Sequence, residues 1–188
     1  MKNALILHGA DGSSRENWFP WLKMELEKRG YKVWVPNLPN SKTPILRDWL
    51  DAIFSNKDGH FDSNSIIVGH SMGATLALRL LEKIQGNVKI NKAVLVAGPV
   101  ELGTKPEYFI YKKDLVTPRF NWPKIKKSAK QFYFIHSDND KYQCGKEQGE
   151  IMKQNLGGEL IVISGGGHFS SEESLEYTQF PLLLGLIK

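Results

Sequence analysis

The sequence predicts a doubly wound α/β fold with a mainly parallel, six-stranded sheet flanked by helices. Six short runs of apolar residues recur along the chain, and they are continuous instead of alternating with polar residues. Such runs are typical of strands that helices bury on both faces, as in a parallel sheet. The segments between the runs carry apolar residues at helical spacing, which completes a repeated strand–helix pattern.

The six runs define the expected strands. They are residues 4–7, 33–35, 66–68, 93–97, 132–135 and 160–163. Between the first two strands we expect a helix, because Trp18, Leu22 and Leu26 share one helical face and Gly30 provides a typical end.

Local signals indicate the remaining helices. Thr43-Pro44 predicts a helix that opens with an N-cap and a first-turn proline. Residues 72–84 are apolar almost all round, which predicts a helix packed closely on the sheet. Residues 145–155 predict a more polar helix, and Ser170 with Glu173 forms a capping-box pattern that would open the last one.

Length and composition indicate one globular domain spanning residues 1–188. Hydrophobic residues make up 41% of the chain and charged residues 24%, which is ordinary for a folded domain. The single cysteine, Cys144, excludes a disulfide framework and a cysteine-rich zinc site. No apolar run approaches the roughly 18 residues of a membrane span, and the first residues lack the features of a signal peptide. We therefore expect a cytoplasmic protein without a membrane partner.

The positive charge is concentrated in residues 99–130. This segment holds eight basic and three acidic residues, a difference that equals the net charge of +5 for the whole chain. The rest of the chain is balanced and carries no aromatic–basic RNA motif, so we expect no nucleic-acid partner. A connection of this length inside a compact domain is usually a lid or a binding segment, and we expect a lid-like excursion.

The same segment offers candidate substrate contacts. It joins the fourth and fifth strands and should emerge at the carboxyl edge of the sheet. Its five aromatic residues could line an apolar acyl pocket; they are Tyr108, Phe109, Tyr111, Phe120 and Trp122. Among them we expect Phe109, Phe120 and Trp122 to bind the substrate. The basic residues of the segment could attract anionic substrates or form a solvated surface.

One pentapeptide points to covalent catalysis. Gly69-His70-Ser71-Met72-Gly73 fits G-x-S-x-G and lies directly after a predicted strand and before a predicted helix. That context is typical of a nucleophile elbow, in which the serine occupies a strained turn and the glycines avoid collisions. Peptide dipoles at the helix N-terminus would stabilise negative charge there. We expect Ser71 to be a nucleophile.

A nucleophilic serine needs a base. In hydrolases with this turn the acid and then the histidine follow the serine along the chain. His168, in a glycine-rich loop after the last predicted strand, is the only histidine late enough to follow an acid. We expect His70 and His136 to be structural and His60 to be solvated.

The acid should follow the fifth strand. Asp138 and Asp140 both lie there. We prefer Asp140 because of its spacing from the strand end, and we expect Asp138 to form a turn. The acid would hold the histidine tautomer and stabilise the imidazolium ion.

An oxyanion hole requires two backbone N–H groups. We expect one from Met72, directly after the nucleophile, and one from Ala10 in the loop after the first strand. That loop contains neither G-K-[ST] nor G-x-G-x-x-G, which argues against a nucleotide site. We expect no cofactor and no metal ion.

These motifs resemble the small serine hydrolases related to retinoblastoma-binding protein 9 and the bacterial YdeN proteins. The resemblance covers nearly the whole chain and is carried by residues 8–9, 18–22, 67–71, 117–125, 138–140 and 167–169. It implies an α/β-hydrolase-like fold without a large cap domain and a triad of Ser71, Asp140 and His168. The L-x-C-x-E motif tied to retinoblastoma binding is absent around Cys144, so we expect no retinoblastoma-type partner.

Three functions stay open at this point. The leading one is a serine hydrolase acting on a small-molecule ester, thioester or amide. The second is a non-catalytic protein-interaction module on a hydrolase fold. The third is a flavodoxin-like domain that would hold the phosphate of FMN in residues 9–14, and absence of a yellow colour in the purified protein would remove it.

Overall fold

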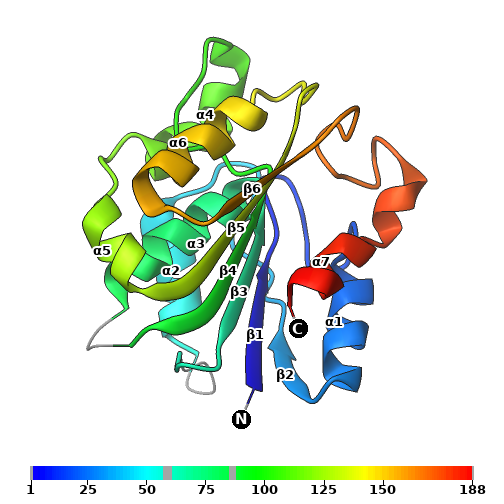
Figure 1. The fold of residues 1–188 in the computed structure, drawn as a ribbon. Coiled ribbons are helices and arrows are strands. Elements are labelled where there is room, and N and C mark those ends of the chain that lie inside the picture. Colours follow the sequence, from blue (N-terminus) through cyan, green and yellow to red (C-terminus); the bar gives the residue numbers. More distant parts are fainter. Residues whose placement is uncertain (1, 57–60, 85–87, 188) are drawn as a thin grey trace.

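The computed structural model describes residues 2–56, 61–84 and 88–187, so the prediction for His60 lies outside the described residues. Its centre is a six-stranded, all-parallel sheet in the order β2-β1-β3-β4-β5-β6 (Figure 1). The strands are β1 (Lys2–Leu7), β2 (Tyr31–Trp34), β3 (Ile66–His70), β4 (Ile90–Val96), β5 (Ala129–Ser137) and β6 (Glu159–Ile163). Each of them contains or overlaps a predicted run, which confirms the predicted fold class.

Helices cover both faces of the sheet. The α-helices are α1 (Phe19–Lys28), α2 (Leu46–Phe54), α3 (Met72–Lys83), α4 (Phe109–Val116), α5 (Trp122–Lys127), α6 (Lys146–Leu156) and α7 (Pro181–Leu186). Two short 3-10 helices, η1 (Pro106–Tyr108) and η2 (Leu175–Thr178), complete the set. Figure 1 shows α1 and α7 on one side of the sheet and the other α-helices on the opposite side. Within the described ranges, no helix combines the length and apolar character of a membrane span.

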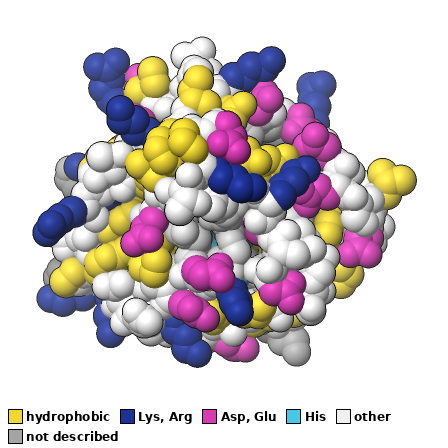
Figure 2. All heavy atoms as spheres, turned by 90° about the horizontal axis from the view of Figure 1, so that it is seen from above, with side chains coloured by type: hydrophobic (Ala, Val, Ile, Leu, Met, Phe, Trp, Pro, Cys, Tyr) yellow, Lys and Arg dark blue, Asp and Glu magenta, His cyan; other side chains and the backbone are white. Residues whose placement is uncertain are grey.

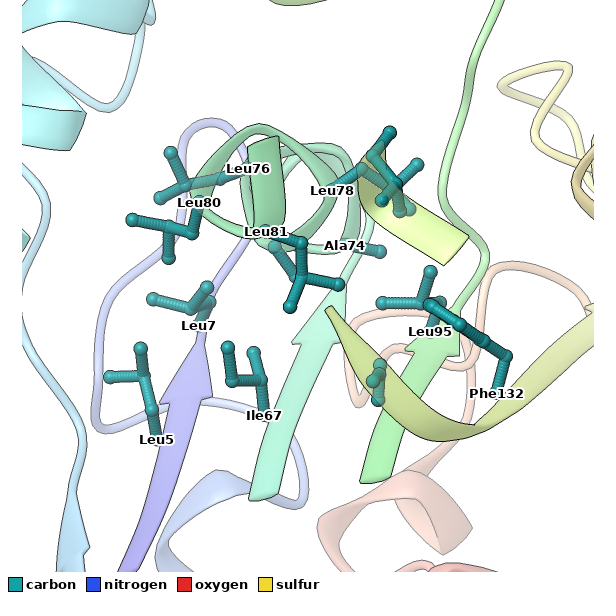
Figure 3. Packing of buried hydrophobic residues seen from close by; sticks show 14 of the residues in the cluster. Leu5, Leu7, Ile67, Ala74, Leu76, Leu78, Leu80, Leu81, Leu95 and Phe132 are labelled. Atoms are coloured by element: carbon teal, nitrogen blue, oxygen red, sulfur yellow. The ribbon is translucent and has the colours of Figure 1, made fainter. Parts of the chain in front are cut away.

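Successive residues of a strand pack into two separate hydrophobic cores, one on each face of the sheet. In β1, Leu5 and Leu7 pack in the cluster beneath α3, whereas Ala4 and Ile6 pack in the cluster beneath α1 and α7. Figure 3 shows the first cluster, with leucines of α3 above Leu5, Leu7 and Ile67. Burial on both faces explains why the strand sequences are continuously apolar.

The order of the strands places two loops side by side. The chain winds from β1 outward to β2 on one side and then to β3 on the other. In open parallel sheets, ligands bind outside the carboxyl ends of the strands at the point where the winding reverses. The loops that follow β1 and β3 meet at that point.

The start of α2 differs from the prediction at Thr43-Pro44. The helix begins at Leu46, and the extended residue Ile45 is its N-cap. The reason is a contact from a distant element, because the Leu46 N–H donates to a carboxylate oxygen of Asp114, in α4, at 2.5 Å. This carboxylate takes the place of the expected local cap.

The segment 99–130 is largely helical, formed by η1, α4 and α5. Arg79 of α3, only 2% exposed, holds the turn between α4 and α5. Its guanidinium donates to the carbonyls of Leu115 (2.8 Å) and Pro118 and stacks 3.6 Å from the ring centre of Phe120. This part of the segment is therefore fastened to the body of the fold.

Candidate active site

Ser71 stands alone between a strand and a helix. β3 ends at His70 and α3 begins at Met72, with Ser71 between them at φ 54° and ψ −126°. This backbone region is costly for a residue with a side chain and is found where function requires it. The Ser71 N–H is fixed to the carbonyl of Val96 in the neighbouring strand at 2.8 Å.

The two glycines of the pentapeptide are required by close backbone contacts. A Cβ atom on Gly69 would lie 2.5 Å from the Ala74 Cα, and one on Gly73 would lie 2.3 Å from the carbonyl oxygen of Leu7. Both distances are too short for non-bonded atoms. The sequence pattern thus reflects a tight strand–turn–helix junction, as in a nucleophile elbow.

Ser71 lines a pocket of about 500 Å³ together with Ala10, Met72 and His168. The pocket lies at the carboxyl edge of the sheet. Figure 2 views this edge and shows histidine inside a central hollow, surrounded by acidic, basic and apolar side chains. The structure therefore brings four residues singled out in the sequence to one cavity.

His168 is paired with Asp140. The His168 Nδ1 atom lies 2.6 Å from an Asp140 carboxylate oxygen, and the Asp140 side chain is fully buried. A carboxylate can only accept, so Nδ1 carries the proton and Nε2 is the basic ring nitrogen. This is the arrangement of an acid and a base in a serine hydrolase triad.

Asp140 is ionised despite its burial. Burial by itself raises the pKa of this carboxyl group. Hydrogen bonds from His168 and from the N–H groups of Tyr142 (2.8 Å) and Cys144 outweigh it and lower the pKa below its ordinary value. A charged carboxylate is the form that stabilises an imidazolium ion.

Asp138 has other partners. Its two carboxylate oxygens accept from the Ser164 hydroxyl at 2.8 Å and the Gly165 N–H at 2.9 Å. These bonds join the end of β5 to the loop after β6. Asp138 therefore shapes the loop that carries His168, and it is Asp140 that contacts the imidazole.

Side chains also hold the backbone of Gly167, directly before His168. The Gly167 N–H donates to the Asn139 side-chain oxygen at 2.8 Å, and its carbonyl accepts from the Ser137 hydroxyl at 2.5 Å. Both partners follow or end β5. The loop after β6 is thus fastened to its neighbouring strand.

The backbone of His168 is held in the same way. Its N–H donates to the Glu173 carboxylate at 2.6 Å, and its carbonyl accepts from His70 Nε2 at 2.7 Å. The predicted capping box at Ser170 and Glu173 is therefore wrong, since no helix starts there and Glu173 instead binds His168 and the Lys141 ammonium group. Five side chains, those of His70, Ser137, Asp138, Asn139 and Glu173, therefore preorganise this loop.

The buried histidines are neutral. Burial lowers the pKa of His70 to about 3, with its ring packed against the rings of Trp18 and His168. Burial also lowers the pKa of His8 and of His136. His136 donates from Nδ1 to the Cys144 carbonyl at 2.8 Å and is fully buried, which fits a structural role.

Because these histidines are buried in the neutral form, we expect the protein to lose stability in mild acid. An unfolded histidine binds a proton near pH 6.5, whereas folded His70 binds one only near pH 3. Between these values the unfolded state binds more protons, so lowering the pH destabilises the fold by up to about 1.4 kcal/mol per pH unit for His70 alone. Urea unfolding at about pH 7.5 and about pH 5 measures the effect. His70→Gln should weaken the pH dependence of the free energy of unfolding. Equal stability of the wild type at both pH values would contradict the inference that the buried histidines are neutral.

The loop after β1 lies against Ser71. A Cβ atom on Gly9 would stand 2.7 Å from the Ser71 Cβ. His8 fixes this loop, because its Nε2 accepts from the Leu38 N–H at 2.8 Å and its Nδ1 donates to the Gly9 carbonyl at 2.8 Å. Ala10 follows directly, and its position in the pocket suits the oxyanion role expected from the sequence.

Met72 is the second expected oxyanion donor. As the first residue of α3, its N–H has no acceptor within the helix. It lines the pocket beside Ser71. Its N–H also lies at the positive end of the helix dipole, which favours an anion.

The three aromatic residues expected at the substrate pocket lie elsewhere. Phe109 lines a separate surface pocket with Ile110. Phe120 and Trp122 stack on each other at 4.8 Å and pack against the core beneath α3, with Arg79 over Phe120. The prediction was therefore wrong for these residues: Phe120 packs under Arg79, Trp122 packs on Phe120, and none of the three lines the pocket that contains Ser71.

Three tyrosines form the aromatic wall of the pocket instead. Tyr108, Tyr111 and Tyr142 line it. The Tyr142 ring stands edge-on to His168 at 4.7 Å and to Tyr108 at 5.3 Å. Tyr108 and Tyr111 belong to the aromatic segment that the sequence predicted at the pocket, whereas Tyr142 was missed. The hydroxyl groups of the three tyrosines give the pocket the mixed apolar and polar lining typical of ligand sites.

One set of possible metal ligands coincides with this site. Donor atoms of Asp140, Cys144 and His168 lie within 4.8 Å of one another. Burial raises the pKa of the Cys144 thiol to about 12, whereas metals bind the thiolate. Asp140 and His168 are engaged with each other, so these residues suit proton transfer better than metal binding.

Comparison with known proteins identifies the family. The profile of the family described as serine hydrolase matches residues 4–187. This chain belongs to the serine hydrolase family. It is 30% identical to YdeN of Bacillus subtilis (strain 168), over 99% of this chain and 94% of YdeN. It is 29% identical to serine hydrolase RBBP9 of Rattus norvegicus, over 90% of this chain and 88% of RBBP9.

Solved structures agree with this family membership. The crystal structure of the ydeN gene product from B. subtilis matches with a TM-score of 0.89 and 30% identity, covering 100% of this chain and 97% of that one. Est1E from Butyrivibrio proteoclasticus matches with a TM-score of 0.68 and 17% identity, covering 100% and 89%, which shows a shared fold alone. The resemblance and the α/β-hydrolase-like fold predicted from the sequence are confirmed.

Proposed function

We propose that this protein hydrolyses a small ester, thioester or amide through an acyl-enzyme formed on Ser71. The observation that carries the proposal is the pocket that Ser71, on its strained turn, lines together with His168, whose Nδ1 lies 2.6 Å from the buried Asp140 carboxylate. Membership of the serine hydrolase family supports it.

In the acylation step, Ser71 Oγ attacks the carbonyl carbon of the substrate. His168 Nε2 takes the hydroxyl proton, because Nδ1 is already engaged by Asp140. The N–H groups of Met72 and Ala10 stabilise the negative oxygen of the tetrahedral intermediate. When the intermediate collapses, His168 gives the proton to the leaving alcohol, thiol or amine.

In the deacylation step, water replaces the leaving group. His168 removes a proton from water, which attacks the acyl carbon and releases the carboxylic acid product. Ser71 regains its proton from His168. The fixed backbone of His168 serves both steps, because the same ring nitrogen must reach first the serine and then the water.

Labelling with a fluorophosphonate probe tests this function. Such probes phosphonylate a serine that a neighbouring base has activated, so the wild type should be labelled at Ser71 and Ser71→Ala should not. The matched control Ser55→Ala, at the exposed C-cap of α2, should label like the wild type. A wild type that binds no probe would favour the non-catalytic interaction module.

A further inference from the structure

Lys112 contributes a buried cation to the wall of the pocket. Of the eight basic residues between 99 and 130, it is the one that lines the cavity with Ser71. Its side chain comes from α4 and is 3% exposed. Lys113, the next residue, is exposed and borders the separate pocket beside Phe109.

No acidic side chain among the described residues forms an ion pair with this ammonium group. Lys112 Nζ donates to the Tyr142 carbonyl at 2.6 Å, contacts the Cys144 thiol and lies 5.8 Å from the centre of the Tyr108 ring. None of the ion pairs found among the described residues includes Lys112. Buried charges are ordinarily paired, because leaving one unpaired is costly.

An ammonium group offers three N–H donors. The Tyr142 carbonyl takes one, and a neutral thiol is a weak acceptor for another. The group therefore retains capacity for a strong acceptor that enters the pocket. A carboxylate meets both needs, since it supplies the missing charge and accepts short, charge-assisted hydrogen bonds.

Acidic residues at the same pocket do not cancel this effect. Asp11, Glu16 and Glu172 also line it, and all three are exposed. The Glu16 carboxylate already accepts from the N–H and hydroxyl of Ser13 at 3.2 and 2.9 Å. Solvent screens exposed charges much more than a buried one. Selectivity should therefore arise from contact inside the pocket and not from long-range attraction.

We propose that Lys112 is a specificity-determining residue, which selects substrates that carry a carboxylate in addition to the bond that is cleaved. The inference rests on the proposed function, because it names the substrate class of the same site. The favoured substrates are monoesters, thioesters or monoamides of dicarboxylic acids. Their second carboxylate would bind Lys112 while the scissile carbonyl meets Ser71.

Matched ester pairs test the inference. The probes are 4-nitrophenyl monoesters of glutaric, adipic, pimelic and suberic acid, each paired with the ester whose free carboxylate is replaced by a primary amide. For the chain length that spans the two groups, the wild type should prefer the anionic ester in kcat/KM by about 10-fold to 100-fold, as expected for a hydrogen bond between charged groups. Lys112→Met, which keeps the alkyl stem, and Lys112→Gln, which keeps a donor, should both lose the preference. Lys113→Met should keep it.

Binding without turnover separates this inference from the proposed function. The Kd values of Ser71→Ala for each pair should show the same preference, and the double variant Ser71→Ala/Lys112→Gln should lose it. Turnover of both esters with equal kcat/KM at every chain length would overturn the inference and leave the hydrolase function standing. Absence of turnover with a retained Kd preference would overturn the hydrolase function and leave the role of Lys112 in carboxylate binding standing. A preference that persists in folded Lys112→Gln would assign Lys112 a purely structural role.

Discussion

Ser71→Ala should abolish hydrolysis of 4-nitrophenyl butyrate while leaving the fold intact. The variant removes the atom that forms the acyl-enzyme, and loss of the serine in a comparable triad lowers kcat roughly 10⁶-fold. Ser71 Oγ makes no hydrogen bond that the structure records among the described residues, so its removal should not destabilise the protein. Release of nitrophenol and the thermal unfolding midpoint measure the two effects.

A second substitution at the same position isolates backbone strain. Alanine retains a Cβ atom at φ 54°, whereas glycine adopts positive φ at little cost. Ser71→Gly should therefore be as inactive as Ser71→Ala but more stable by about 1 kcal/mol. Turnover close to that of the wild type in either folded variant would refute the assignment of Ser71 as the nucleophile. Equal stability of the two variants would refute backbone strain at this position.

The strands could be predicted from sequence because each is buried on both faces. Leu5 and Ile6 point to opposite cores and are both apolar, which produces a continuous run that needs no knowledge of the partner strands. The elbow could be predicted for a similar reason. Its glycines are dictated by contacts within one strand–turn–helix unit and with the adjoining end of β1.

Only part of the pocket wall could be predicted, because the helical segment formed by η1 and α4 is not ordinarily amphipathic. Tyr108, Tyr111, Lys112 and Leu115 share one inward face at helical spacing. The more apolar Ile110 is 60% exposed instead. Hydrophobicity therefore indicated the wrong face of this segment, because the face that lines a pocket need not be the most hydrophobic one.

Contacts from outside the local helix turn account for the other failures. Asp114 caps α2 from a position 68 residues away, and Glu173 binds His168 where a local pattern predicted a helix cap. A capping motif describes what a carboxylate can do within its own turn. It does not show that the backbone N–H of His168 binds the same carboxylate instead.

Asp140→Asn and Asp138→Asn should differ greatly in their effect on catalysis. At Asp140 the amide can donate to His168 Nδ1, which would move the imidazole proton to Nε2 and remove the base that Ser71 needs. The same exchange in a comparable triad lowers kcat on the order of 10⁴-fold. At Asp138, an asparagine oxygen can still accept from the Gly165 N–H, now 2.9 Å away, so the loop should be retained and kcat should change little. Steady-state hydrolysis of 4-nitrophenyl butyrate and the rate of fluorophosphonate labelling should both report this order. A large loss in Asp138→Asn with little loss in Asp140→Asn would mean that the pair seen at 2.6 Å is not the one that drives the reaction.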